Sequence, residues 1–243
     1  MNSIVVKNLT KRYGEKVAVN NISFEINEGE LFSLLGVNGA GKTTTIKMLS
    51  TLILPNSGQV KINGLDIKKD SMKIKEIINV SPQETAIGGN LTVLENLDFM
   101  CGVYNIKNKK EKIDEIVKMF KLDNVLKQKA KTLSGGWQRK LSIAIALINE
   151  PKILFLDEPT LGLDVLARKE LWKIIESLKG KVTIILTTHY MEESEKLSDR
   201  VGVMNEGKLI SIGTVNELLK KTKTKTLEDA FVSIVDGGNY ENN

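Results

Sequence analysis

A phosphate-binding motif covers residues 36–43, which read Gly-Val-Asn-Gly-Ala-Gly-Lys-Thr and match the pattern G-x-x-x-x-G-K-[ST]. The backbone N–H groups of such a loop converge on phosphate oxygens, and the dipole of the following helix favours their negative charge. Lys42 is expected to reach the β- and γ-phosphates, Thr43 to coordinate Mg²⁺, and Thr44 to hydrogen-bond a neighbouring phosphate. The residues expected to contact a nucleotide here are Gly36, Asn38, Gly39, Ala40, Gly41, Lys42, Thr43 and Thr44.

Two consecutive carboxylates, Asp157 and Glu158, follow the apolar run 153–156. A strand that ends there would present Asp157 at the edge of a sheet, where its carboxylate can hold a cation through water. The competing interpretation of two adjacent acids is a helix N-cap or a surface pair. The apolar run before them favours a Mg²⁺ site.

Two further polar residues follow segments that we expect to be buried strands. Gln83 comes after the apolar stretch 77–80, and its amide could sense Mg²⁺ or an attacking water. His189, the only histidine, follows the run 184–188. Taken alone, Gln83 fits a plain loop residue and His189 fits a structural histidine. The residues expected at the metal site are Thr43, Asp157 and Gln83.

The segment 133–138 reads Leu-Ser-Gly-Gly-Trp-Gln and forms a second candidate anion site. Ser134, Gly135 and Gly136 precede a helix expected to begin near Trp137, so their N–H groups lie at its positive end. On its own this run fits an ordinary serine N-cap with a glycine turn equally well. The basic residues and the apolar helix that follow favour the anion site.

These candidate residues need a scaffold that alternates strands and helices. Residues 31–35 predict a short buried strand directly before the phosphate loop, and 42–52 have the composition of a helix that Pro55 prevents from extending far. Helical periodicity over 91–147 predicts a helical lobe.

Further strands are predicted before the phosphate loop and after Pro151. Segments 4–9 and 22–26 predict a small, mostly antiparallel sheet. After Pro151, strands are expected at 153–156, 182–187 and 201–204, with a helix near 165–178.

Composition limits the class of protein. The chain has 243 residues, 41% of them hydrophobic, so it can bury a large core. Its net charge of +5 comes from 35 basic residues interspersed with 30 acidic ones, which favours a solvated surface over weak attraction to a membrane. Cys101 is the only cysteine, so we expect a small buried residue, no internal disulfide and a reducing cytoplasm. No membrane span or signal peptide is recognisable, so a membrane role is expected only through a partner.

The order of phosphate loop, serine-glycine run and strand with two carboxylates resembles the ATP-binding cassette (ABC) ATPase family, and the likeness runs from Tyr13 to Phe231. The resemblance implies an α/β fold with a P-loop NTPase (RecA-like) core, an N-terminal antiparallel β subdomain and an inserted helical subdomain. The expected divisions are an ABC ATPase domain over 1–220 (core 1–84 and 148–220, helical subdomain about 85–147) and a short C-terminal tail over 221–243. The stretch 220–226 is expected to be a mobile link to that tail.

The resemblance also implies roles for single residues. It makes Glu158 the general base that polarises the attacking water, with Lys42 and His189 as the other catalytic residues and His189 at the γ-phosphate. Gln83 matches the glutamine loop of the family. Tyr13 takes the place of the aromatic ring that stacks on adenine, with a simple packing role as the alternative. The implied cofactors are ATP and Mg²⁺.

The serine-glycine run further implies a partner. In the family this signature closes on the γ-phosphate held by another subunit, so Ser134, Gly135 and Gly136 are expected to contact ATP across a dimer. Asp164 matches an aspartate that communicates between the two sites. Trp137 departs from the family pattern, in which glutamine is usual. The implied partner is a second copy of this chain or a homologous ATPase subunit, and no nucleic acid is expected.

Segments 188–193, 197–201 and 226–231 resemble the type-2 ABC exporters, which move drugs, peptides, sodium or polysaccharides outward, although Ala230 stands where valine or isoleucine is usual. This likeness implies an ATP-hydrolysing subunit that powers export through a separate integral-membrane permease, at the cytoplasmic face of the cell membrane. The alternative is a soluble ABC-type ATPase acting in translation or DNA repair. Such proteins usually carry two cassettes or a long coiled coil, and the sequence has neither.

Overall fold

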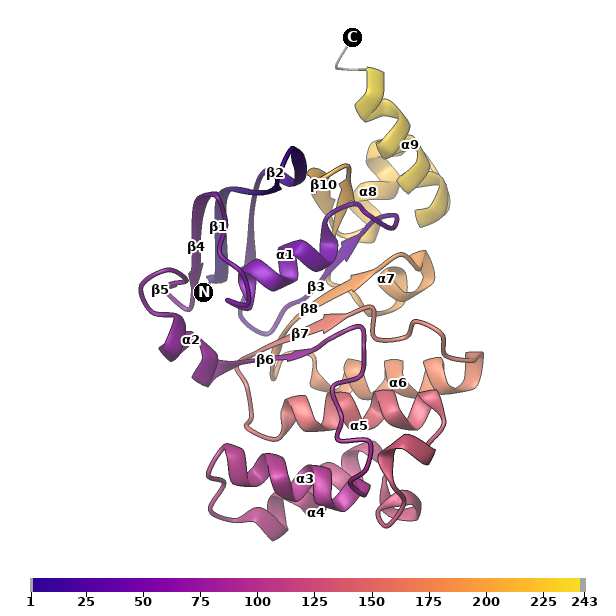
Figure 1. Cartoon of the computed structure of the whole chain (residues 1–243). Helices are drawn as coiled ribbons and strands as arrows, with labels where there is room; N and C mark the ends of the chain where they lie inside the picture. The colour runs from indigo at the N-terminus through magenta and orange to yellow at the C-terminus, as the bar shows by residue number, and fades with distance from the viewer. Residues whose placement is uncertain (1, 241–243) are drawn as a thin grey trace.

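Two β-sheets form the centre of the molecule, as Figure 1 shows for the computed structural model, which describes residues 2–240. The first sheet has the strand order β2-β1-β4-β5 with antiparallel neighbours throughout. Its strands are β1 (Asn2–Tyr13), β2 (Lys16–Asn27), β4 (Ser57–Ile62) and β5 (Leu65–Asp66). The predicted antiparallel sheet is confirmed, and its first two strands are longer than the segments 4–9 and 22–26 indicated.

The second sheet has six strands in the order β10-β9-β3-β8-β7-β6. All neighbours are parallel except β10, which runs antiparallel to β9 at one edge. Its strands are β3 (Leu31–Leu35), β6 (Ile78–Ser81), β7 (Ile153–Asp157), β8 (Thr183–Thr188), β9 (Arg200–Asn205) and β10 (Lys208–Gly213). Because the central strands are parallel, their carboxyl ends meet along one edge, where ligands bind in open α/β sheets.

The six-stranded sheet is buried on both faces. In β7, Leu154 and Leu156 join the core under helices α5 and α6, whereas Ile153 and Phe155 join the core shared with α1 and the first sheet. All five residues of β7 are buried, as expected for a parallel strand covered on both sides. The covering helices are α1 (Lys42–Leu49), α5 (Gly135–Leu147) and α6 (Val165–Leu178).

Helices fill the region 91–147, as its periodicity predicted. The first of them starts with a capping box: Thr92 Oγ1 accepts from the Glu95 N–H at 3.2 Å, and Glu95 Oε2 accepts from the Thr92 N–H at 2.7 Å. Cys101 is completely buried there, as expected. This lobe contains α3 (Val93–Val103), α4 (Lys109–Phe120), 3₁₀ turns at Asp123–Val125 and Ala130–Thr132, and α5.

Helix α1 is shorter than the expected span of 42–52. It stops at Leu49, because the Ser50 hydroxyl donates to the Ile46 carbonyl at 2.8 Å and Thr51 then adopts a left-handed backbone with φ of 62°. Pro55 comes later and does not end the helix. The local bonding of serine therefore decides the boundary.

Within the described residues, the segment expected as a short tail over 221–243 contains the end of helix α8 and the whole of helix α9. Helix α8 continues through Thr222, so part of the presumed link at 220–226 is helical, and the Thr222 and Thr224 hydroxyls share a 2.8 Å hydrogen bond in the turn that follows. Leu227 and Phe231 of α9 pack against β3 and β9. The remaining helices are α2 (Ser71–Ile77), α7 (Met191–Leu197), α8 (Val215–Thr222) and α9 (Leu227–Tyr240).

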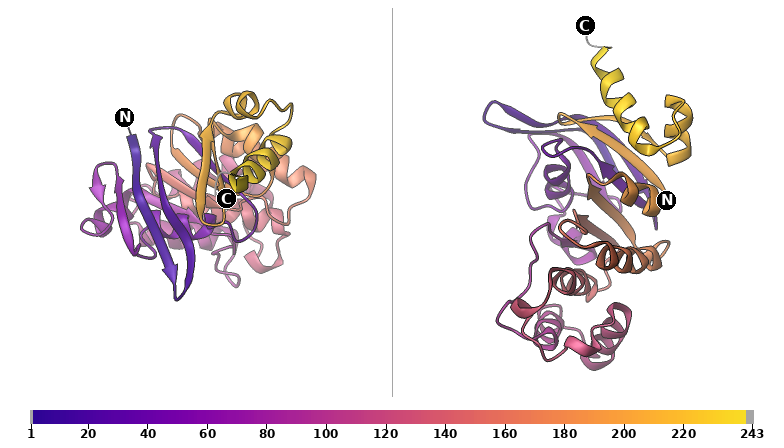
Figure 2. Two further views of the ribbon diagram at one scale, coloured as in Figure 1. Left: turned by 90° about the horizontal axis from the view of Figure 1, so that it is seen from above. Right: turned by 90° about the vertical axis from the view of Figure 1, so that its right-hand side faces the viewer.

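The helical lobe and α9 lie at opposite ends of the molecule, with the sheets between them (Figure 2). Within residues 2–240, none of the helices combines the length and apolar character needed to cross a membrane.

If α9 is part of the folded unit, Phe231→Ala should lower the free energy of unfolding by about 3–5 kcal/mol, because it removes a large side chain from a packed core. The matched control is Val232→Ala, whose side chain is 51% exposed and whose loss should cost under about 0.5 kcal/mol. Denaturant unfolding followed by circular dichroism measures both. Equal, small effects would contradict the packed position of α9.

Candidate active site

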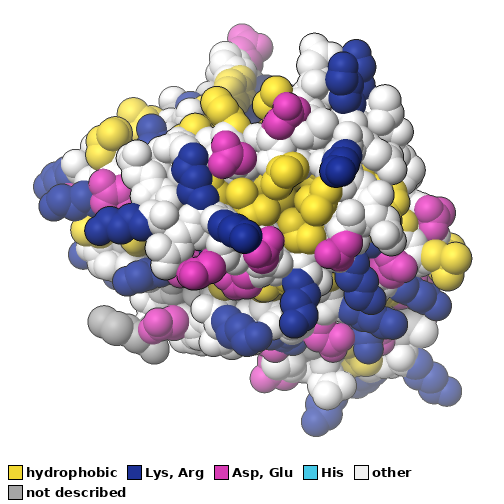
Figure 3. Space-filling view, turned by 90° about the horizontal axis from the view of Figure 1, so that it is seen from below, with side chains coloured by type: hydrophobic (Ala, Val, Ile, Leu, Met, Phe, Trp, Pro, Cys, Tyr) yellow, Lys and Arg dark blue, Asp and Glu magenta, His cyan; other side chains and the backbone are white. Residues whose placement is uncertain are grey.

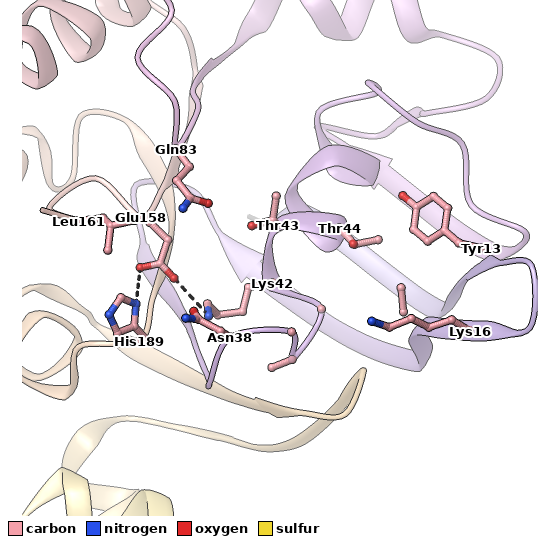
Figure 4. Close-up of a pocket in the computed structure, with 14 residues that line it drawn as sticks. Tyr13, Lys16, Asn38, Lys42, Thr43, Thr44, Gln83, Glu158, Leu161 and His189 are labelled. Atoms are coloured by element: carbon pink, nitrogen blue, oxygen red, sulfur yellow. Dashed lines mark hydrogen bonds and ion pairs between the residues drawn. The ribbon is translucent and has the colours of Figure 1, made fainter.

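The carboxyl edge of the six-stranded sheet holds a pocket of about 450 Å³ (Figure 4). The segments that follow β3, β8, β7 and β6 all reach it. Most of the residues predicted from the phosphate loop lie in its wall, together with Gln83, Glu158 and His189. The lining residues are Tyr13, Lys16, Ala18, Asn38, Gly39, Ala40, Gly41, Lys42, Thr43, Thr44, Gln83, Glu158, Leu161 and His189.

The phosphate loop has a backbone that only glycine accommodates at two positions. A Cβ on Gly36 would lie 2.3 Å from the carbonyl oxygen of Met204, and Gly41 has a φ of 101° directly before α1. The loop therefore packs closely on β9 and leads directly into α1, with Asn38 to Thr44 lining the pocket. Gly36 itself does not line the pocket, and it contributes through its carbonyl oxygen.

The Lys42 ammonium makes three contacts in the pocket wall. It donates to the Gly36 carbonyl at 2.7 Å and to the Val37 carbonyl at 3.2 Å, and it forms an ion pair with Glu158 Oε1 at 3.2 Å. The two carbonyl contacts are hydrogen bonds, and the contact with Glu158 is an ion pair. An anionic phosphate oxygen that binds Lys42 would therefore approach an ammonium that already neutralises a carboxylate.

Glu158 lies between a cation and an imidazole. Its Oε2 is 2.8 Å from His189 Nδ1 while its Oε1 faces Lys42, as the dashed lines of Figure 4 indicate. Only 5% of Glu158 is exposed. Its backbone has a φ of 49°, uncommon outside glycine, and is held by the Glu158 N–H, which donates to Thr187 O at 3.1 Å and Oγ1 at 3.0 Å. Each carboxylate oxygen of Glu158 thus has a polar partner, and the side chain lines the pocket.

An oxygen-rich corner lies beside the phosphate loop. The Thr43 hydroxyl donates to Asp157 Oδ1 at 3.0 Å, and the Thr187 hydroxyl donates to the same oxygen at 2.5 Å. Hydroxyl and carboxylate oxygens are the ligands that Mg²⁺ prefers, usually with substrate phosphates completing its shell. Within residues 2–240 no group of three or more histidine, cysteine or acidic side chains could hold a metal alone. This corner therefore fits a Mg²⁺ ion that arrives with a nucleotide.

The remaining predicted side chains lie on two sides of the pocket. Gln83 points inward between Glu158 and Thr43, whereas Tyr13 and Lys16 lie at the far end (Figure 4). Tyr13 is 50% exposed, so a face of its ring is available for stacking.

Four residues that line the pocket or support its side chains were not predicted from the sequence. Lys16 pairs with Tyr13 across the β1–β2 hairpin, and that hairpin was the signal that could have revealed it. Ala18 and Leu161 also line the pocket, and Thr187 supports Asp157 and Glu158 from within β8.

The serine-glycine run lies apart from the pocket. Ser134 is the N-cap of α5 without a side-chain capping bond, and a Cβ on Gly135 would meet nothing within 4 Å. The N-terminus of α5 is therefore open at Gly135, whereas a Cβ on Gly136 would lie 3.0 Å from the Cβ of Ala167. Asp164 caps α6 by accepting from the Ala167 N–H at 3.0 Å, and its carboxylate does not reach the pocket of its own chain.

Trp137, the unusual residue of the run, packs on its own chain. Its ring lies against the core of the helical lobe, and the Lys140 ammonium stands 4.4 Å from the ring centroid. Lys140 in turn pairs with Glu170 of α6 at 2.6 Å. Trp137, which stands where the family usually has glutamine, therefore packs within its own chain.

A buried carboxyl supports the histidine segment from behind. Glu193, four residues after His189, is completely buried in α7, and the Trp172 indole N–H donates to it at 3.0 Å. Burial raises the pKa of Glu193, and the hydrogen bond from Trp172 offsets part of that rise. The contact fixes α7 to α6 just beyond His189.

Comparison with known proteins agrees with this geometry. The family model for ABC transporters matches residues 19–161. The chain is 40% identical over 240 residues to the probable multidrug ABC transporter ATP-binding protein YbhF of Escherichia coli, covering 96% of this chain and 41% of that protein. It is 39% identical to the linearmycin resistance ATP-binding protein LnrL of Bacillus subtilis, covering 93% of this chain and 74% of that one.

A solved structure shares the fold. The dimeric post-hydrolysis state of the ATP-binding cassette MJ0796 bound to ADP and Pi superposes with a TM-score of 0.79 at 27% identity, covering 87% of this chain and 98% of that one. The chain spans about two fifths of the length of YbhF, the first of these relatives. The resemblance inferred from the sequence is confirmed: the chain is an ABC-type ATPase domain and belongs to the ABC transporter family, in the type-2, exporter-like group.

Proposed function

We propose that this chain binds ATP with Mg²⁺, hydrolyses it to ADP and phosphate, and thereby powers export through a membrane permease. The observation that carries this proposal is the position of Glu158, held between Lys42 and His189 in the pocket of the phosphate loop. A carboxylate there can accept a proton from a water molecule that attacks the terminal phosphate.

Phosphate binding would change the partners of Glu158. Lys42 is paired with the Glu158 carboxylate, and a phosphate oxygen that binds the same ammonium would bring a second negative charge beside it. Repulsion between the two anions would then favour separation of Glu158 from Lys42. Displaced from Lys42, Glu158 keeps its hydrogen bond to His189 and can turn one oxygen to water. The pocket thus couples nucleotide arrival to release of the general base.

Mg²⁺ would be held by Thr43 and Asp157 with phosphate oxygens, and we assign Gln83, which lines the same pocket, as a further ligand, directly or through water. When bound, the ion neutralises charge on the phosphates. Thr187 keeps the Asp157 carboxylate oriented toward this corner.

We further propose that two ATPase subunits sandwich two ATP molecules. Three features support this: the N-terminus of α5 is open at Gly135, the serine-glycine run does not line the pocket of its own chain, and the similar cassette MJ0796 forms a dimer. A helix N-terminus that is open in this way can bind a phosphate on a partner subunit. The second subunit is another copy of this chain or a homologue.

Replacing the general base tests this mechanism. Glu158→Gln should lower kcat about 100-fold or more, because general-base catalysis contributes that order of acceleration. ATP contacts remain, so ATP with Mg²⁺ should shift this variant to a dimer in size-exclusion chromatography. The matched control, Glu192→Gln, changes a 63% exposed glutamate near His189 and should leave both properties unchanged. Wild-type turnover in Glu158→Gln would refute the base assignment.

The helical lobe supports docking of a permease. Figure 3 shows apolar side chains gathered on the face seen from below, where the lobe lies in Figure 1. On α3, Phe99 and Val103, about one helical turn apart, are 61% and 54% exposed. Large apolar groups exposed together mark interaction sites. We assign this face, next to the segment of Gln83, to a permease at the cytoplasmic side of the membrane.

Export as the direction of transport rests on the relatives, whose names include multidrug transport and linearmycin resistance. These names support a transporter subunit over the alternative role in translation or DNA repair.

A docking variant tests the permease assignment. Phe99→Ser should reduce the amount of permease that co-purifies with the chain from detergent-solubilised membranes, because it removes a central exposed apolar contact, and ATP hydrolysis by the isolated chain should persist. Val232→Ser changes a residue on α9 that is 51% exposed, compared with 61% for Phe99, and serves as the control. Unchanged co-purification in Phe99→Ser would exclude this face, and recovery of ribosomes or DNA with the wild-type chain would favour the alternative function.

A further inference from the structure

Arg139 of α5 is a buried cation that the chemistry above does not use. Only 4% of it is exposed. Its Nη1 donates to the Pro82 carbonyl at 2.6 Å, and its Nη2 donates to the Gln83 carbonyl at 2.5 Å. Within residues 2–240 it forms no ion pair with a carboxylate, whereas the adjacent Lys140 pairs with Glu170 at 2.6 Å. Its two hydrogen bonds are therefore directed at the backbone before α3.

Burying this guanidinium without a paired carboxylate is costly, so its partners must be well placed. Burial lowers the pKa of Arg139, and the charges of Asp157 and Glu193 offset part of that effect. The planar fork of arginine reaches the two consecutive carbonyl oxygens through separate nitrogens, Nη1 and Nη2, in a fixed geometry that a lysine ammonium lacks. Any movement of α5 away from residues 82–83 would leave the guanidinium without acceptors, and this holds the two segments together.

The two segments that Arg139 joins serve different functions. The segment after β6 passes α5 on its way to α3 (Figure 1), and the Gln83 side chain points into the pocket (Figure 4). Helix α5 begins at Gly135, about one turn before Arg139, directly after the N-cap Ser134. Arg139 thus connects the backbone of Gln83 with the first turns of α5, the helix that begins in the serine-glycine run.

We propose that Arg139 is a positioning residue for ATP hydrolysis: it fixes the backbone of Pro82 and Gln83 to α5, so that the Gln83 amide and the start of α5 move as one body. The inference rests on the proposed ATP sandwich. In that sandwich, Gln83 lies at the ATP bound by its own chain, and the serine-glycine run contacts the ATP bound by the partner subunit. Arg139 then links the two ATP sites through a single chain.

Steady-state phosphate release by the full chain tests this role. Arg139→Met should lower kcat about tenfold, a change equivalent to about 1.4 kcal/mol, because the Gln83 backbone loses both donors. The KM for ATP should change less than about threefold, since Lys42 and its loop are untouched. Arg139→Lys, which keeps the charge without the fork, should fall between Arg139→Met and the wild type.

Ser142→Ala is the matched control. Ser142 lies one turn further along α5, and its hydroxyl shares a buried 3.0 Å hydrogen bond with Ser81 in the same contact between α5 and β6. Removing it perturbs that packing but leaves the carbonyls of residues 82–83 paired with Arg139. Its kcat should stay within about twofold of the wild type.

A double-mutant cycle with Gln83→Ala separates positioning from structural support. If Arg139 acts through Gln83, Arg139→Met should cause no further loss of kcat in the Gln83→Ala background. Losses that multiply, or a wild-type kcat for Arg139→Met, would overturn the inference. Thermal unfolding establishes that the variants fold, and Arg139→Lys replaces Arg139→Met in the cycle if the latter does not. A wild-type chain that releases no phosphate would overturn the proposed function and this inference with it.

Discussion

The parallel pairing of β3, β8, β7 and β6 is the constraint on which the site depends. The register places Leu35 opposite Thr188 and Asp157 opposite Thr187, so neighbouring strands end at the same level of the sheet. The residues that follow these strands therefore converge even though they are far apart in sequence. A slip of one residue in a strand would reverse the direction of its side chains and remove them from the pocket. The mainly apolar sequences of β3 and β7, buried on both faces, hold that register.

Charges buried at this edge give the pocket its chemistry. Lys42, Asp157, Glu158 and Arg139 are each 5% exposed or less. In an environment poor in water each of these groups needs specific partners, and each has them: carbonyls for the cations, hydroxyls for Asp157, and Lys42 with His189 for Glu158. An arriving phosphate competes for one of these partners. Nucleotide binding can therefore rearrange side chains without a large movement of the sheet.

The motif residues were predictable because backbone geometry and charge requirements act locally. The phosphate loop and Asp157 could be placed from a strand, a turn and a helix in the right order, and the strands after Pro151 followed from apolar runs, whereas the role of Glu158 rested on the family resemblance. The supporting roles of Thr187 and Arg139 could not be predicted in the same way, because their hydrogen-bond partners lie in distant segments of the chain. The sequences around these two residues are typical of an ordinary strand and an ordinary helix. The roles of Gln83, His189 and Tyr13 needed the family resemblance. The packed position of α9 was missed because the polar stretch before it obscured the apolar residues that anchor it.

A crystal structure of the full chain with a non-hydrolysable ATP analogue and Mg²⁺ tests the exchange of partners most directly. The distance to measure is that from Lys42 Nζ to the nearest phosphate oxygen. We predict hydrogen-bonding distance, about 2.7–3.2 Å, with Glu158 separated from Lys42 and still bonded to His189. Phosphates bound elsewhere, with the pair between Lys42 and Glu158 intact, would contradict this mechanism.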